Sequence, residues 1–317
     1  MNKKLIFVLG ADFSGTTLLD LTLGSAVESA SLGEVASFFN PTSSHHLNPL
    51  CSCQSKCGLW NRNSINIKDP YRQFFDFHDR NVLVDSSKDP SWVATQSRIA
   101  KNSGTEVFMV LIWKQADEYA RSCANRGNPY GWADKWLRYH RAVAQLNMPI
   151  YTLSLNSIRN NNSETLDALC SYLGLTYSEE MNNLKSKTHH IAFGSSTARQ
   201  SLHTVGSDGW QLEHYRSHRN DIQGKTITKP VELAGATNQS IRDIQNLLTP
   251  DGLKPAKLLP GQHYLRKAIV RKRLERATYL LGLNPSAVRR PIRALERYRK
   301  TNKHICCLLY TSPSPRD

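Results

Sequence analysis

The sequence contains no apolar run that approaches the roughly 20 residues needed to span a bilayer. A short apolar run at residues 5–10 leads into a Gly/Ser/Thr loop, and no small-residue cleavage site typical of a secretory leader follows it. No internal repeat is present, and 39% hydrophobic with 21% charged residues is typical of a globular protein. We therefore expect a folded cytoplasmic protein.

Acidic residues are scarce relative to basic ones: 26 Asp and Glu face 41 Lys and Arg, which gives a formal net charge of +15. The excess is concentrated in residues 262–305, which hold thirteen Lys or Arg and two acids. We expect residues 261–306 to form a basic helical tail that meets an anionic surface. Three interpretations fit this pattern. The tail could contact the inner face of the membrane peripherally, it could bind an anionic glycan, or it could pack on the domain with its basic face in solvent. A nucleic-acid partner is the least expected.

The last eleven residues, CLLYTSPSPRD, back-translate to a sequence that resembles a transposon-based sequencing adapter read in frame. We expect residues 307–317 to be an artefact of this kind. The alternative is a genuine Pro/Ser-rich tail. Under either interpretation these residues are assigned no function.

Paired C-x2-C spacings, which are typical of zinc sites, are missing. Instead, Cys51, Cys53 and Cys57 form a C-x-C-x3-C cluster. His45 and His46 could complete a metal site with them, but the spacing does not demand one. Small buried thiols or one local disulfide are interpretations at least as good, so we assign no metal ligand.

Apolar runs and helical patterns alternate along most of the chain. Continuous apolar runs predict buried parallel strands at residues 4–9, 81–85, 106–112 and 149–155. Helices are predicted at residues 16–25, 92–101, 117–125, 132–146, 163–173, 238–248, 264–281 and 286–300. This alternation predicts an α/β fold with three layers, in which helices flank a mainly parallel central sheet. We expect one domain over residues 1–260, with an irregular, cysteine-containing insertion at 40–70.

A phosphate-binding loop is predicted between the first strand and the first helix. The segment GADFSGTT, residues 10–17, has the G-x4-G-x-[ST] spacing, whose backbone N–H groups can close around phosphate oxygens at a helix N-terminus. Thr16 replaces the lysine that reaches the terminal phosphates of a nucleoside triphosphate. A P-loop kinase or nucleotide hydrolase is therefore the less favoured alternative.

These motifs resemble the PAPS-dependent sulfotransferases, whose sulfuryl donor is 3′-phosphoadenosine 5′-phosphosulfate, and in particular their bacterial branch. SGTT at residues 14–17 matches the loop that grips the 5′-phosphosulfate. Lys114, followed by Ser122 eight positions later, matches the pair that grips the 3′-phosphate, with Lys in place of the usual Arg. SLGEV (31–35), LVDSSKDP (83–90) and KTHHIAFGSSTAR (187–199) also match. The resemblance assigns donor binding to Ser14, Gly15, Thr16, Thr17, Lys114, Ser122 and Arg199.

The resemblance implies sulfuryl transfer from PAPS as co-substrate, with no metal required. Glu34 would take the proton of an acceptor hydroxyl or amine, and Lys88 would meet the charge that develops near the transferred group. Asp85 and Asp89 are alternative bases, and the two histidines of the 187–199 segment have at most a pocket role. A carbohydrate or glycolipid acceptor follows from the bacterial members of the family and from no residue of this chain.

One position departs from the family pattern. Immediately before the SGTT serine the family has Lys, Arg or sometimes His, and this chain has Phe13. The missing charge leaves a second function open. The chain could be a catalytically impaired protein that binds the donor nucleotide on the same fold.

Overall fold

The computed structural model describes most of the chain in separate stretches. They are residues 2–41, 46–47, 49–53, 57–61, 65–66, 68–160, 162–185, 187–195, 198–199, 202, 235–259 and 263–281. His45, the helix predicted at 286–300 and residues 307–317 lie outside the described residues.

Six strands form one sheet in the order β2-β3-β1-β4-β5-β6. The first five run parallel, and β6 pairs antiparallel with β5 at one edge. β1 lies between β3 and β4, as expected for an apolar strand that is covered on both faces. The strands are β1 (Lys4–Leu9), β2 (Ser29–Gly33), β3 (Val82–Asp85), β4 (Glu106–Trp113), β5 (Ile150–Ser154) and β6 (Gly252–Lys254).

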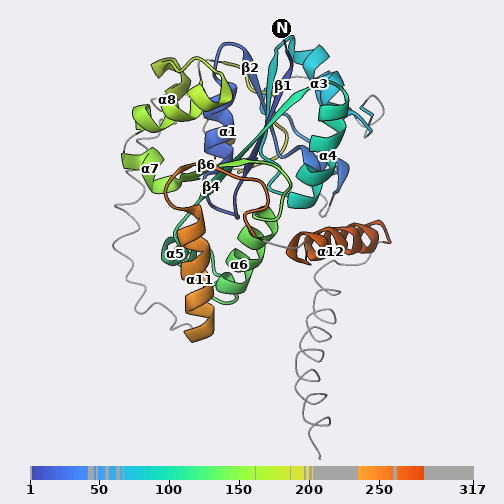
Figure 1. Ribbon diagram of the computed structural model, residues 1–317. Coiled ribbons are helices and arrows are strands. Elements are labelled where there is room, and N and C mark those ends of the chain that lie inside the picture. Colours follow the sequence, from blue (N-terminus) through green and yellow to red (C-terminus); the bar gives the residue numbers. More distant parts are fainter. Residues whose placement is uncertain are drawn as a thin grey trace, which may run out of the picture.

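Helices cover both faces of the sheet. Figure 1 shows α1, α7 and α8 on one face and α3 and α4 on the other. The helices are α1 (Thr16–Gly24), α2 (Val35–Phe39), α3 (Pro70–His78), α4 (Pro90–Asn102), α5 (Ala116–Ala124), α6 (Trp132–Val143), α7 (Leu155–Asn160), α8 (Asn162–Leu173), α11 (Gly235–Leu248) and α12 (His263–Leu280). Two short 3-10 turns occupy Gly58–Trp60 and Glu179–Asn182.

The two faces of β1 are buried in two separate hydrophobic clusters. Leu5, Phe7 and Leu9 belong to the cluster that includes α3, α4 and α6. Ile6 and Val8 belong to the cluster that includes α1, α7 and α8. Successive side chains of a strand point to opposite faces, so one apolar strand can serve both cores.

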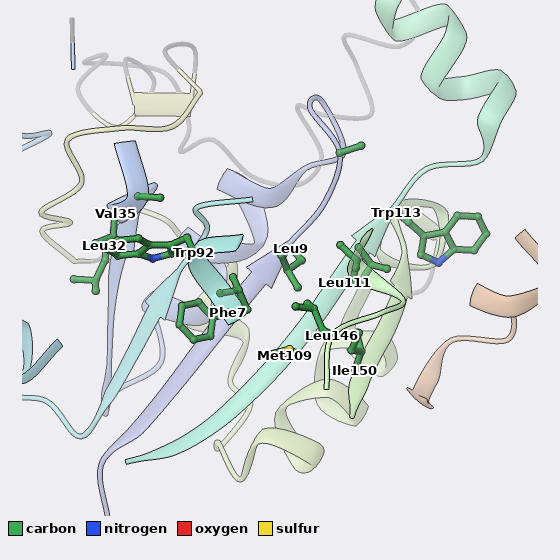
Figure 2. Close-up of a cluster of buried hydrophobic side chains, with 14 of the residues drawn as sticks. Phe7, Leu9, Leu32, Val35, Trp92, Met109, Leu111, Trp113, Leu146 and Ile150 are labelled. Carbon is green, nitrogen blue, oxygen red and sulfur yellow. The ribbon is translucent and has the colours of Figure 1, made fainter. Parts of the chain in front are cut away.

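Figure 2 shows the first of these clusters, in which Phe7 of β1, Met109 of β4 and Trp92 of α4 lie together. The indole Nε1 of Trp92 also donates to Asp85 Oδ2, 3.1 Å away at the end of β3. The core therefore helps to fix the turn that follows β3.

The predicted fold class is confirmed: the structure is α/β, with helices on both faces of a mostly parallel sheet. The sequence analysis missed β2, α2, α3, α7 and β6. β2 reads SASLG, a run of small and polar residues without a strand pattern, and it is nevertheless fully buried. α3 carries a usable signal, because Pro70 starts it and Tyr71, Phe74 and Phe75 line its buried face.

The first helix of the predicted basic tail, α12, packs against α6 and α4. The backbone N–H groups of Tyr264 and Leu265 both donate to Gln145 Oε1, at 2.9 and 3.0 Å. The Arg141 guanidinium lies 5.1 Å from the centre of the Tyr264 ring. Within the described stretches, no helix combines the length and apolar character needed to cross a membrane. The domain boundary at residue 260 and a membrane contact of the tail stay predictions.

Candidate functional site

Most of the predicted site residues lie at one edge of the sheet, because the carboxyl ends of parallel strands are on the same side. Loop 10–15 follows β1, Glu34 follows β2, Lys88 lies in the turn after β3, and Lys114 follows β4. Because β1 lies between β3 and β4, the turns carrying Lys88 and Lys114 flank the loop. This edge is where ligands bind in open α/β sheets.

Loop 10–15 has two residues in the left-handed region of backbone conformation: Phe13 has a φ of 67° and Gly15 a φ of 91°. Ser14 lies between them, and its side-chain Oγ is buried without a hydrogen-bond partner among the described residues. Leaving a buried hydroxyl unpaired costs about 1–3 kcal/mol. The Ser14 hydroxyl is therefore ready to bind an added acceptor such as a phosphate oxygen.

Thr16 and Thr17 begin α1, where the first backbone N–H groups of a helix have no partner within the helix. Both side chains are buried. Thr17 Oγ1 accepts a hydrogen bond from the backbone N–H of Ser195 at 3.1 Å, so the segment at 187–195 contacts the helix start. A Cβ on Gly10 would lie 2.6 Å from Thr16 Cγ2, so the loop can close here only around glycine.

Lys114 and Ser122 lie together, with Lys114 Nζ donating to Ser122 Oγ at 3.0 Å. Lys114 is only 6% exposed, and it forms no ion pair with any residue that the structure describes. Burial, and then the charge of Arg159, lower the pKa of Lys114 to about 8. A buried ammonium group without a carboxylate partner is poorly stabilised, and a bound anion would relieve this cost.

Two arginines that the sequence analysis did not single out lie beside this pair. Arg126 Nη1 donates to the backbone oxygen of Ser122 at 2.9 Å, and its guanidinium carbon lies 4.1 Å from the centre of the Phe13 ring. Arg159 pairs with Glu118 at 3.3 Å. Neither arginine lies in a matched motif, so no spacing marked them. Although Phe13 carries no charge, its ring contacts the Arg126 cation and so keeps a positive charge beside the loop.

Glu34 and Lys88 form an ion pair of 2.6 Å, and each side chain is 19% exposed. Burial lowers the pKa of Lys88, but the Glu34 carboxylate, with the charges of Asp12 and Asp20, raises it by more, and the net effect is a raised pKa. Lys88 has a left-handed φ of 58°, which few non-glycine residues adopt. The turn therefore holds an ammonium group and a carboxylate in contact at the carboxyl edge.

Asp85 and Asp89, the alternative bases, have structural partners. Asp85 is fully buried, and its carboxylate accepts hydrogen bonds from the Tyr71 hydroxyl and from the Ser87 backbone N–H. Burial raises the pKa of Asp85 to about 6. Asp89 accepts from the backbone N–H groups at the start of α4. Both carboxylates thus stabilise the turn that carries Lys88.

Arg199 does not contact Lys114 or Ser122 in the hydrogen bonds of the described residues. Its Nη1 donates to the backbone oxygens of Ala192, at 2.7 Å, and Leu50, at 3.3 Å. Burial lowers its pKa. Arg199 therefore joins two loops, and a contact with a donor phosphate stays a prediction.

A cavity of about 270 Å³ lies at the opposite end of α1, between Gly24, Ser31, His78 and His190. No residue of the 10–17 loop lines it. The candidate site is therefore located by the strand ends, the Ser14 hydroxyl and the Lys114 ammonium group, and it is separate from this cavity.

No family model and no curated protein matches the chain. Among solved structures, the sulfotransferase domain from the curacin biosynthetic pathway is similar to 77% of this chain over 98% of its own length, with 14% identity and a TM-score of 0.53. The sulfotransferase domain from the Synechococcus PCC 7002 olefin synthase is similar over 77% of this chain and 95% of its own, with 16% identity and a TM-score of 0.49. The expected sulfotransferase fold is confirmed by the first of these likenesses.

Proposed function

We propose that this protein is a sulfotransferase that transfers a sulfuryl group from PAPS to a hydroxyl or amine acceptor. The observation that carries the proposal lies beside the 10–17 loop: the buried Lys114 ammonium group is hydrogen-bonded to the half-buried Ser122 and forms no ion pair with any carboxylate of the described residues. A 3′-phosphate would supply the missing anion, and ATP carries no such group. A carbohydrate or glycolipid acceptor is the first class to be tried.

The residues present fit this donor. The Ser14 hydroxyl and the N–H groups at the start of α1 would hold the 5′-phosphate, and Lys114, Ser122 and Arg126 would hold the 3′-phosphate. PAPS, when bound, supplies an activated sulfuryl group on its 5′-phosphate. The Arg126 cation would also offset the absence of a basic side chain at Phe13.

Glu34 would act as the general base. Its carboxylate accepts the acceptor's proton while the acceptor oxygen or nitrogen bonds to sulfur, and the electrons of the breaking sulfur–oxygen bond pass to the leaving phosphate. Lys88, now paired to Glu34 at 2.6 Å, would stabilise the charge on that phosphate. A general base of this kind contributes about 10²–10⁴-fold to the rate.

A catalytically impaired, donor-binding protein is the second candidate. Phe13 supports it, because the family pattern has a basic residue at this position. The two candidates share the donor site and differ only in turnover, so binding and transfer must be measured separately.

The first experiment measures thermal stabilisation of the full chain by adenosine 3′,5′-bisphosphate, beside Mg-ATP. A ligand at 100 times its Kd adds about 2.7 kcal/mol of stability. We expect a shift with the bisphosphate that Lys114→Ala and Ser122→Ala remove. Glu34→Gln is the matched control, because it should keep the bisphosphate shift and lose sulfuryl transfer.

A shift with Mg-ATP alone would contradict the proposal and favour the kinase alternative. A bisphosphate shift without transfer to any sugar, amine or lipid acceptor would favour the impaired protein. If Lys114→Ala retains the full shift, the 3′-phosphate site is assigned wrongly.

A further inference from the structure

Three cysteines and one histidine, far apart in the sequence, meet at a single point. The Sγ atoms of Cys51, Cys53 and Cys57 and the Nδ1 atom of His190 all lie within 4.8 Å of one another. Cys51 Sγ is 3.3 Å from Cys53 Sγ and 3.9 Å from His190 Nδ1, and Cys57 Sγ is 3.4 Å from that Nδ1. No disulfide joins the cysteines of the described chain.

These distances are close to those in the ligand shell of a tetrahedral zinc ion. With Zn–S bonds of about 2.3 Å and a Zn–N bond of about 2.0–2.1 Å, a tetrahedron places two sulfurs about 3.8 Å apart and sulfur and nitrogen about 3.5 Å apart. The two sulfur–nitrogen separations, 3.9 and 3.4 Å, lie on either side of the expected value, and the sulfur–sulfur separation of 3.3 Å is somewhat shorter than expected. A thiolate-rich set with one imidazole also favours zinc over magnesium or calcium, which prefer oxygen ligands.

Hydrogen bonds connect the cysteine segment to the segment around His190. The backbone N–H of Ser52 donates to Ile191 O at 2.8 Å, and the Ile191 N–H donates back to Ser52 Oγ at 3.2 Å. Trp60 Nε1 donates to the backbone oxygen of His190 at 2.8 Å. The residues beside Cys51, Cys53 and His190 are therefore already paired, so these ligand atoms need little rearrangement to bind an ion.

We propose that Cys51, Cys53, Cys57 and His190 bind one zinc ion in a closed structural site. Four protein ligands complete the tetrahedron and leave no position for a water or a substrate. The proposal does not rest on sulfuryl transfer. It assigns a role to the cysteine cluster, for which the sequence left a metal, free thiols and a disulfide open.

The site would connect the cysteine insertion to the segment at 187–195. That segment also reaches the candidate functional site, because Phe193 O accepts from the Glu34 N–H at 3.2 Å and the Ser195 N–H donates to Thr17 Oγ1. The zinc ion would thus hold in place the loop that contacts both the base and the phosphate-binding helix.

The test is the zinc content of the full chain, purified without immobilised metal and measured by elemental analysis after gel filtration. We expect about one zinc per chain, and close to none in Cys57→Ser or His190→Ala. Cys123→Ser and Cys170→Ser are matched controls that should retain the zinc, because both cysteines are buried outside the cluster.

Unsubstituted protein provides a second readout that does not depend on how the variants fold. Exchange with Co²⁺ should produce thiolate-to-cobalt charge transfer and strong visible bands of tetrahedral cobalt, and a chelator should expose three additional reactive thiols. Three results would each overturn the proposal. The protein could be zinc-free with a disulfide among the three cysteines, it could be zinc-free with three freely reactive thiols, or it could hold iron and inorganic sulfide in place of zinc.

Discussion

Lys114 combines burial with positive neighbours, and both lower its pKa to about 8. The residue therefore loses its charge near the upper end of the physiological pH range. If Lys114 binds the 3′-phosphate, affinity for adenosine 3′,5′-bisphosphate should fall about tenfold between pH 7 and pH 9, because only the protonated form attracts the anion. Isothermal titration calorimetry at several pH values measures this dependence.

Lys114→Arg is the matched control, because a guanidinium keeps its charge throughout this range. Its bisphosphate affinity should stay nearly constant from pH 7 to pH 9. An equally steep decline in both proteins would mean that another group titrates and that Lys114 does not bind the phosphate.

At the scale of elements, the end of β2 lies close to the 187–195 segment. Gly33 has a φ of 68°, and a Cβ there would lie 2.4 Å from Phe193 O. Gly131 has a similar φ of 72° with open space around it. We expect Gly131→Ala to cost about 1–2 kcal/mol for the left-handed backbone alone. Gly33→Ala should cost about 1–3 kcal/mol more, because the loop must move.

Urea denaturation of the two variants gives the difference in unfolding free energy. Gly33→Ala should also reduce the proposed sulfuryl transfer more than Gly131→Ala, because Glu34 follows Gly33 directly. Equal losses of stability in the two variants would show that the close approach of Gly33 to Phe193 O adds nothing to the free-energy cost of the substitution.

At the scale of the whole molecule, His140 makes stability depend on pH. It is fully buried in α6, and burial lowers its pKa to about 4, against about 6.5 in an unfolded chain. Between these values the unfolded state binds more protons, so the stability that His140 confers above pH 6.5 is lost as the pH falls toward 4. His140→Gln should flatten the dependence of unfolding free energy on pH over this range.

Asp85 acts in the opposite direction. Its pKa is raised to about 6 by burial, so between about pH 4 and pH 6 the folded state binds more protons and stability falls as the pH rises. Asp85→Asn should therefore steepen the loss of stability on acidification that His140 causes. Urea denaturation from pH 4 to pH 7 checks both variants, and a profile unchanged by either substitution would contradict these pKa shifts.

The sequence by itself determined the fold class, because the apolar runs of β1, β3, β4 and β5 and the helices between them are local patterns. It also indicated the phosphate-binding loop, since that motif depends on a short spacing at a strand end, and the resemblance to the sulfotransferases pointed to Lys114 and Ser122. β2 was not predicted, because its residues are small or polar and are buried only by neighbouring elements of the fold.

Only the tertiary structure decided which distant residues meet. Arg126 lies over the ring of Phe13, Glu34 pairs with Lys88, and His190 lies beside the three cysteines. None of these contacts has a sequence spacing that predicts it, because each joins loops that follow different strands or helices. The parallel sheet brings Glu34 to Lys88, because it places the ends of β2 and β3 at one edge.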